Sequence, residues 1–227
     1  MTIKSIKVKA NNITKIYLET DEFTYAELKL LCPKGDFKKV DDEMRRIMLA
    51  TKVVDEFDLQ KGQEFSFGKM VEIIGRSNLE RAYKYGIWLL SKRDYSAEGL
   101  KDKVSENYGL EAGEFAAEKI CEQNFIDDEN YAKRLAEQLI SFKKLSTREA
   151  LRQMQSKGIY LDKASLVLEE MEVDDTVQIE SLVRAKYSKL TQSAEGIKKL
   201  RQTLYGKGFQ SQNIGEFVEK LGEFDEY

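Results

Sequence analysis

Two pairs of adjacent aspartates, Asp127-Asp128 and Asp174-Asp175, are the side chains in this sequence that come closest to a chemical site. Carboxylates are ligands that hard cations such as Ca²⁺ prefer. Two neighbouring carboxylates do not make a coordination sphere, however, and each pair stands where a helix is expected to begin. The first aspartate then caps the helix by accepting a free backbone N–H, and the second places negative charge at the positive end of the helix dipole. The sequence therefore predicts no metal site at either pair.

These four aspartates are interpreted instead as structural joints between helices. With Asp127 as the cap, Ile126 and Tyr131 occupy the two positions of a hydrophobic staple, which would fix the angle between the helices. Tyr131 is therefore included among the joint residues.

The composition argues against most catalytic chemistry. The 227-residue chain has no histidine, which removes the commonest general base, the histidine triads and the usual zinc ligands. Its two cysteines, Cys32 and Cys121, lack CxxC spacing and fit small buried side chains in a reducing compartment. The sequence contains neither a phosphate-binding loop nor an apolar run long enough for a membrane span. We expect a cytoplasmic protein that is not an enzyme, with no catalytic residues, no metal and no cofactor.

Charge is banded along the second half of the chain, although the formal net charge is only −3. Residues 106–130 hold eight acids and one lysine, residues 133–157 hold seven bases and two acids, and residues 184–207 hold seven bases and one acid. Arg148 and Arg152 are four apart, so they project from one helix face. Such bases often serve only the helix dipole or a wet surface. Aligned on neighbouring helices, they would form a basic stripe suited to nucleic-acid phosphates or to an acidic protein groove.

The helices that carry these bands recur with a period of about 50 residues. Each of three helix caps precedes an apolar residue four places later, and each helix ends near a glycine. The caps are Ser96, Thr147 and Ser193, and the glycines are Gly109, Gly158 and Gly208. A period of this size containing three helical segments indicates tandem three-helix units. We expect a mainly α fold in which three tandem three-helix repeats form an elongated, curved array.

The N-terminal part is expected to be a small β-containing extension with short helices. Alternating apolar residues predict strands around residues 6–8, 16–18 and 26–30, with a turn at Asn11-Asn12. The apolar spacing becomes helical over residues 40–54, and another short helix is expected to end at Gly75. The chain then divides into five segments: 1–76, the extension; 77–126, 127–172 and 173–222, the three repeats; and 223–227, an acidic tail.

Several short motifs in the helical part resemble the bacterial regulatory protein RecX family. The motif similar to the family's central signature is Ile126-Asp127-Asp128-Glu129-Asn130-Tyr131-Ala132, followed by Lys143, Leu151 and Lys157-Gly158-Ile159. The motif similar to its first repeat is Arg93-Asp94-Tyr95-Ser96 with Leu100 and Lys103, and the one similar to its last is Lys207-Gly208-Phe209 with Ile214. The match runs in the right order from about residue 82 to residue 221, and the motifs are specific as a set rather than singly.

Some positions depart from the family pattern. Gly99 stands where an acidic residue is expected, and Leu145-Ser146 stands where a glycine usually follows the basic pair. Residues 36–55 look inserted, whereas residues 59–62 resemble part of the N-terminal extension of some members.

The resemblance implies a non-enzymatic, monomeric regulator of the RecA recombinase. RecX proteins lie along the groove of the RecA filament and inhibit its ATPase and strand exchange, which modulates recombination and DNA repair. The implied partners are the RecA filament and single- or double-stranded DNA within it. On this hypothesis the partner-binding residues are the basic ones, namely Lys92, Arg93, Lys143, Lys144, Arg148, Arg152, Lys157, Lys198, Lys199 and Arg201.

Two other interpretations stay open from the residues alone. The three-helix units could act as helix-turn-helix modules of a DNA-binding protein, which would bind DNA alone with a steep dependence on salt. The chain could also be an unrelated helical scaffold in which the charge bands only set how the repeats stack.

Overall fold

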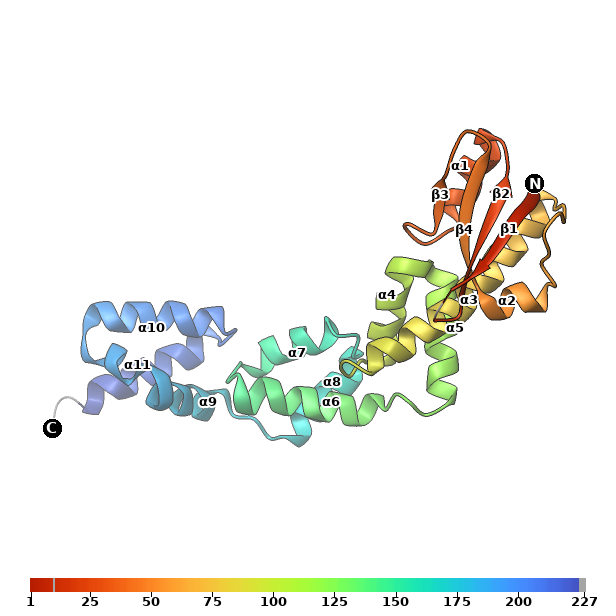
Figure 1. Cartoon of the computed structure of the whole chain (residues 1–227). Coiled ribbons are helices and arrows are strands. Elements are labelled where there is room, and N and C mark those ends of the chain that lie inside the picture. The colour runs from red at the N-terminus through yellow and green to blue at the C-terminus, as the bar shows by residue number, and fades with distance from the viewer. Residues whose placement is uncertain (10, 225–227) are drawn as a thin grey trace. The chain divides into compact units, whose positions relative to one another are not determined.

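The computed structural model describes residues 1–9 and 11–224 of the chain. The protein is mainly helical with a small sheet at its N-terminal end, which confirms the predicted fold class at this level (Figure 1). The chain divides into two compact units, Met1–Ile126 (unit 1) and Asp127–Tyr227 (unit 2). The predicted acidic tail begins inside the last helix, and its residues 225–227 lie outside the described part. None of the described helices combines the length and apolarity that crossing a bilayer demands.

Four antiparallel strands form the sheet, in the order β1-β2-β4-β3. They are β1 (Thr2–Val8), β2 (Ile13–Glu19), β3 (Phe37–Lys39) and β4 (Met44–Ala50). The predicted first two strands are confirmed, as is the turn between them. Asn11 and Asn12 both have positive φ, 68° and 58°, a conformation that asparagine tolerates better than most residues and that suits a tight hairpin.

The third predicted strand, over residues 26–30, is wrong because this segment is helix α1 (Glu22–Leu30). Asp21 caps the helix, and its carboxylate accepts hydrogen bonds from the backbone N–H and the hydroxyl of Thr24, both at 2.8 Å. Of the apolar residues that suggested alternation, only Leu28 is buried, whereas Leu30 is 87% exposed. The helix cap at Asp21 was the better indicator of structure here than the alternation of apolar residues over 26–30.

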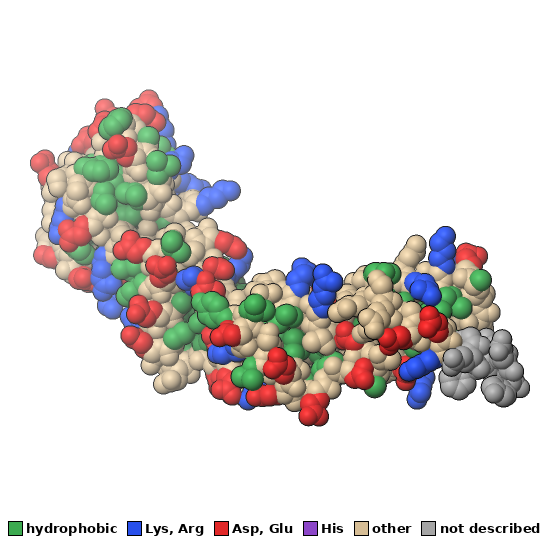
Figure 2. All heavy atoms as spheres, turned by 180° about the vertical axis from the view of Figure 1, so that it is seen from behind, with side chains coloured by type: hydrophobic (Ala, Val, Ile, Leu, Met, Phe, Trp, Pro, Cys, Tyr) green, Lys and Arg blue, Asp and Glu red, His purple; other side chains and the backbone are tan. Residues whose placement is uncertain are grey.

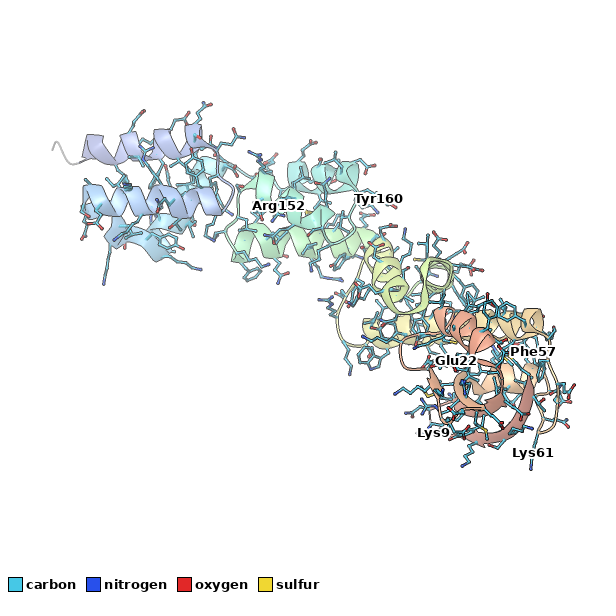
Figure 3. The ribbon with its side chains drawn as sticks, turned by 90° about the horizontal axis from the view of Figure 1, so that it is seen from above. Lys9, Glu22, Phe57, Lys61, Arg152 and Tyr160 are labelled. Atoms are coloured by element: carbon cyan, nitrogen blue, oxygen red, sulfur yellow. The ribbon has the colours of Figure 1, made fainter. Side chains whose placement is uncertain are left out.

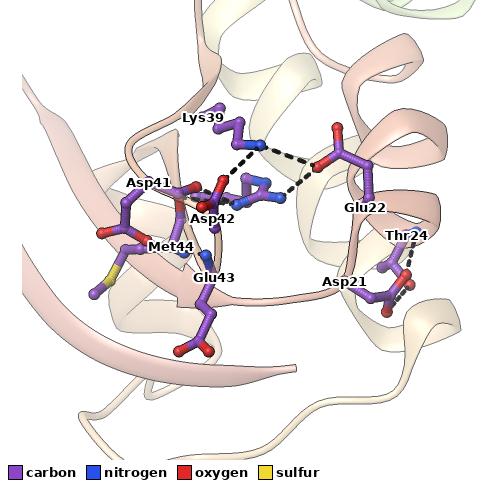
Figure 4. A network of polar contacts seen from close by, with 9 residues as sticks. Asp21, Glu22, Thr24, Lys39, Asp41, Asp42, Glu43 and Met44 are labelled. Atoms are coloured by element: carbon purple, nitrogen blue, oxygen red, sulfur yellow. Dashed lines mark hydrogen bonds and ion pairs between the residues drawn. The ribbon is translucent and has the colours of Figure 1, made fainter.

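The helix predicted over residues 40–54 is also wrong, because residues 44–50 of this span form β4 and only residues 51–54 are helical. Arg45, Ile47 and Leu49 alternate on the buried face of β4 with 0–1% exposure. The alternation of buried and exposed residues was not recognised in the sequence, because an arginine such as Arg45 is normally expected on the exposed face. Its guanidinium donates to Glu22 at 2.7 Å and to the carbonyl of Asp41 at 2.7 Å, within the polar network of Figure 4. The guanidinium also lies over the ring of Tyr25.

The segment 36–55, expected to be an insertion, therefore supplies β3, β4 and most of helix α2 (Thr51–Glu56). β4 pairs with β2 on one side and with β3 on the other, so it is an inner strand of the sheet. The sheet depends on this segment.

Helix α3 (Phe67–Leu90) connects the sheet to the helices that follow it in unit 1. The predicted helix end at Gly75 is wrong, since α3 runs through this residue without interruption. Its first half packs Met70, Ile73 and Ile74 into the core beneath the sheet. Its second half packs Ala82 and Leu89 into another core, shared with α4 (Ala97–Tyr108) and α5 (Leu110–Glu122).

Unit 2 contains two further groups of three helices, each enclosing its own apolar cluster. The first group is α6 (Asp128–Glu137), α7 (Thr147–Gln155) and α8 (Leu161–Glu170). The second is α9 (Asp175–Leu182), α10 (Ala194–Gly206) and α11 (Ser211–Phe224). A π-helical turn follows the first helix of each group: η1 (Gln138–Phe142) after α6 and η2 (Val183–Tyr187) after α9. The 3-10 turn η3 (Ser188–Gln192) follows η2.

The predicted helix ends agree with the structure at most positions. Ser96 and Ser193 cap α4 and α10, whereas the cap of α7 is Ser146 rather than the predicted Thr147. The three predicted glycines have φ between 80° and 87°, the left-handed conformation expected where a helix stops. That the three helix groups are copies of one repeat remains a prediction.

Candidate partner-binding groove

A groove in unit 2 lies between helix α7 and the corner that joins α10 to α11. It has a volume of about 1070 Å³ and is open to solvent. Its lining residues with charged, amide or hydroxyl groups include Arg148, Arg152, Gln155, Tyr205, Gln210, Ser211 and Gln212. Two of the predicted partner-binding residues, Arg148 and Arg152, therefore lie in one groove.

The start of α7 is held in place by residues that are distant in sequence. Ser146 is buried, and its hydroxyl caps the helix by accepting a hydrogen bond from the N–H of Glu149 at 3.1 Å. Asp175 accepts from both the N–H and the hydroxyl of Thr147, at 2.9 and 3.0 Å. An aspartate from the first turn of α9 thus satisfies a free donor of α7. This contact fixes one wall of the groove.

The opposite wall is set by the corner Lys207-Gly208. The carbonyl of Lys207 accepts from the N–H of Ser146 at 3.2 Å, and its ammonium donates to the carbonyl of Lys143 at 3.0 Å. Gly208 has φ 87°, and a Cβ atom there would lie 2.5 Å from the Cβ of Glu149 and 2.7 Å from the hydroxyl of Ser146. Only glycine allows the corner to lie this close to α7.

The two arginines of the groove differ electrostatically. Arg152 donates to both carboxylate oxygens of Glu149, at 2.8 and 2.7 Å, and Gln153 donates to the same carboxylate at 2.8 Å. These hydrogen bonds, Arg152 first, lower the pKa of Glu149 from 4.5 to about 2. The Glu149–Arg152 pair is therefore neutral near pH 7. Arg148 is exposed and has no ion pair within the described residues, so its charge is the uncompensated one.

The chemistry of the groove is that of recognition. Arginine donates several N–H groups in a fixed planar arrangement, and glutamine and tyrosine add neutral donors and acceptors. Across the described part of the chain, no group of three or more acidic or cysteine side chains is placed to hold a metal ion. A partner that offers carboxylates or other polar acceptors fits this groove better than an apolar one does.

The other predicted residues of unit 2 lie outside this groove. Lys143 and Lys144 follow the turn η1, where Lys144 adopts a positive φ of 55°, and Lys157 stands just after α7. Lys198, Lys199 and Arg201 lie exposed on α10, where Lys199 pairs with Glu195 at 2.8 Å. On the face drawn in Figure 2, basic side chains of unit 2 stand in small groups separated by other surface. Figure 3 shows the position of Arg152 on α7.

Lys92 and Arg93 belong to unit 1, directly after α3. The ammonium of Lys92 lies 5.7 Å from the ring of Trp88, and the guanidinium of Arg93 lies 4.5 Å from the ring of Tyr95. Both cations are thus held against aromatic rings, a contact that the charge pattern alone did not suggest.

The predicted joint residues are found at helix starts. Asp127 caps α6 by accepting from the N–H of Asn130 at 2.9 Å, which lowers the pKa of Asp127, and Asp174 caps α9. Asp128 and Asp175 occupy the first turns of these helices. Ile126 and Tyr131, the predicted staple, pack against different clusters, Ile126 in unit 1 and Tyr131 in unit 2.

Several groove residues were missed by sequence reasoning. Tyr205, Gln210, Ser211 and Gln212 carry no charge and stand beside the motif Lys207-Gly208-Phe209, whose glycine was interpreted only as a helix end. The closeness of this glycine to α7 is a tertiary contact, and no local pattern encodes it.

Comparison with known proteins places this fold among regulatory proteins. No family model matches the chain. Regulatory protein RecX of Haemophilus influenzae is 30% identical over 149 residues, which cover 63% of this chain and 93% of that protein. Regulatory protein RecX of Clostridioides difficile is 24% identical over 191 residues, which cover 83% of this chain and 90% of that protein.

Two solved structures share the fold. A crystal structure of regulatory protein RecX aligns with a TM-score of 0.55 at 20% identity, over 96% of this chain and 98% of that one. RecX from Lactobacillus salivarius aligns with a TM-score of 0.51 at 18% identity, over 64% of this chain and 97% of that one.

Proposed function

Since this chain belongs to the RecX family of regulatory proteins, we propose that it is a non-enzymatic regulator that binds the RecA filament and inhibits its ATPase and strand exchange. On this proposal it acts in the cytoplasm as a monomer, without a cofactor, and so modulates recombination and DNA repair.

The proposed scaffold is a set of three repeats, α3–α5, α6–α8 and α9–α11, preceded by the N-terminal sheet. Each group encloses its own apolar cluster, and a serine caps the middle helix of each. The proposed segments are residues 77–126, 127–172 and 173–222. Repeats of this kind present extended surfaces rather than pockets, which suits a filament as partner.

The observation that carries the proposal is the groove that contains Arg148 and Arg152. Arg148 offers an uncompensated charge, and the amide and hydroxyl groups around it can hydrogen-bond to a polar protein surface. We propose that this groove contacts RecA, and that Lys143, Lys144, Lys157 and the bases of α10 add weaker electrostatic attraction. Lys92 and Arg93 would add a contact from unit 1.

A titration of RecA's DNA-dependent ATPase tests the proposal. The wild-type chain should lower the rate in a dose-dependent way, and the double charge reversal Arg148→Glu with Arg152→Glu should abolish this effect while the circular dichroism spectrum stays unchanged. Among single variants, Arg148→Gln should weaken inhibition more than Arg152→Gln, because Glu149 already neutralises Arg152.

A matched control is Lys163→Glu with Lys220→Glu, which changes the net charge equally at residues that do not line the groove. This variant should inhibit like the wild type. If saturating wild-type protein leaves the ATPase rate unchanged, the proposed function is wrong. If both double variants lost inhibition equally, the interaction would depend on the overall charge of the chain rather than on this groove.

A further inference from the structure

The outer face of the N-terminal sheet carries a cluster of cations around a single aromatic ring. Along β1, β2 and β4 the residues on the other face are buried, among them Ile16, Leu18 and Ile47 at 0–1% exposure. Because side chains alternate along a strand, their neighbours in sequence face outward. The strand register places Lys7 opposite Lys15, and it places Tyr17, Arg46 and Lys38 in a row.

None of these cations pairs with an acidic side chain in the described part of the chain. Within the described residues, no ion pair involves Lys7, Lys15, Lys38 or Arg46, and the pair Lys4–Glu19 joins the other ends of β1 and β2. Lys9, after the end of β1 (Figure 3), adds a fifth cation. Like charges placed directly opposite each other destabilise a sheet. The repulsion on this face therefore disfavours folding, and no ion pair among the described residues offsets it.

Two further details describe the surroundings of these cations. The side chain of Lys9, then burial and the charges of Lys9, Arg46 and Lys7, lower the pKa of Lys15. Arg46 makes one long hydrogen bond, 3.3 Å to the carbonyl of Gly35, and its buried Nε has no partner within the described residues. An anion placed over the face would relieve the repulsion between these cations.

The ring of Tyr17 indicates which kind of anion would suit this face. Tyr17 lies on the inner strand β2, next to Arg46 in the row, and is partly exposed. The ammonium of Lys7 lies 5.3 Å from its ring centre. A sheet that presents an aromatic ring among cations is suited to stacking a base while the cations hold the phosphates on either side. Four strands make such a face roughly 14 Å wide, which accommodates a short stretch of single strand.

We propose that the outer sheet face of unit 1, formed by Lys7, Lys15, Tyr17, Lys38 and Arg46, binds single-stranded nucleic acid. Tyr17 stacks on a base and the surrounding cations contact the backbone. This surface is separate from the groove of unit 2 and does not depend on the function proposed for that groove.

Fluorescence anisotropy of the full chain with a labelled oligodeoxythymidine of about 20 nucleotides tests the proposal. The variant Lys7→Gln, Lys15→Gln, Arg46→Gln should bind at least about tenfold more weakly near 100 mM salt. Its slope of log affinity against log salt should be smaller by about 2, because about 0.7 counterion is released per contacted phosphate of a single strand. Tyr17→Leu should weaken binding roughly fivefold or more and leave this slope unchanged.

The matched control removes three lysines from helices of the same unit, Lys29→Gln, Lys69→Gln and Lys84→Gln. It changes the net charge equally, and it should bind like the wild type. Equal loss in both triple variants, or no binding by the wild type at low salt, would overturn the proposal. So would duplex binding as tight as single-strand binding together with an unaffected Tyr17→Leu variant. Binding to anionic vesicles without binding to the oligonucleotide would also overturn it, in favour of a membrane surface.

Discussion

Glu149 gives the groove of unit 2 a dependence on pH. Its pKa is lowered from 4.5 to about 2 in the folded chain, so its ionised form stabilises the fold at pH values above about 4.5. This contribution is lost as the pH falls toward 2, when the carboxylate takes up a proton and its hydrogen bonds with Arg152 weaken.

The variant Glu149→Gln keeps the shape of the side chain and removes its charge. Near pH 6 its free energy of unfolding, measured with urea, should be lower than that of the wild type. The difference should shrink progressively between about pH 4.5 and pH 2. A difference that stays constant down to pH 2 would mean that the charge of Glu149 does not stabilise the fold.

Arg45 shows why one strand could not be predicted from the sequence. Its position on the buried face is stabilised by Glu22, by the carbonyl of Asp41 and by the ring of Tyr25, which are separated from it by up to 23 residues. A pattern of apolar residues contains none of this information. By contrast, Ser96 and Asp127 could be predicted as caps, because each accepts a hydrogen bond from a backbone N–H only three residues later.

At the scale of elements, the approach of the α10–α11 corner to α7 depends on Gly208. Gly208→Ala should destabilise the chain by about 2 kcal/mol or more, because the methyl group would overlap Glu149 and Ser146 and the residue would keep a positive φ. Urea unfolding measures the loss, and the same variant should weaken inhibition of RecA by shifting one wall of the groove.

Gly206 is the natural control, since it lies two residues earlier at the end of α10 and a Cβ atom there would meet nothing within 4 Å. Gly206→Ala should leave stability within about 1 kcal/mol of the wild type or raise it slightly. Similar losses in both variants would contradict the close packing described for Gly208.

Asp175 joins two helices, and its removal should cost more than the removal of an ordinary first-turn acid. Asp175→Ala takes two hydrogen bonds from Thr147 and should lower the free energy of unfolding by about 1–2 kcal/mol. Asp162→Ala removes a first-turn acid of α8 and should cost only a few tenths of a kcal/mol. If both variants lost the same free energy of unfolding, Asp175 would stabilise the chain only through the dipole of its own helix.

The ends of helices were harder to predict in unit 1 than in unit 2. Helix α3 passes through Gly75 because its two halves are packed in two different cores, a gain larger than the roughly 1 kcal/mol that a glycine costs inside a helix. In unit 2, helices α6, α7, α9 and α10 begin at side-chain caps, and α7 and α10 are followed by left-handed glycines. The order and approximate ends of these helices therefore follow from short-range signals. The groove itself could not be predicted in this way, since its walls are 50 or more residues apart in sequence (Gln155 to Tyr205).

At the scale of the whole molecule, the two units should fold independently. Unit 1 encloses the cores of the sheet and of α3–α5, and unit 2 encloses those of α6–α8 and α9–α11. Separate chains of residues 1–126 and 127–227 should each unfold cooperatively in urea and keep helical circular dichroism spectra.

A chain of residues 1–76 should behave differently, because it ends inside α3 and loses Ser77, whose hydroxyl accepts a hydrogen bond from the buried N–H of Ala50 at 2.8 Å. It should unfold at a lower urea concentration than residues 1–126, or fail to fold. Equal midpoints would mean that the sheet does not need the second half of α3.

The π-helical turn η1 (Gln138–Phe142) is a place in unit 2 where residues should not be inserted or deleted without disturbing the structure. A π-turn contains one residue more than an α-turn, so deleting a residue from 138–142 would leave a regular α-turn and change where the carbonyl groups of this segment point. The carbonyl of Ile140 would turn away from the buried amide of Gln178, which donates to it at 2.5 Å, and the carbonyl of Lys143 would leave Lys207. Insertions and deletions between related genes should therefore be absent from this turn and should collect in exposed corners such as Lys61-Gly62.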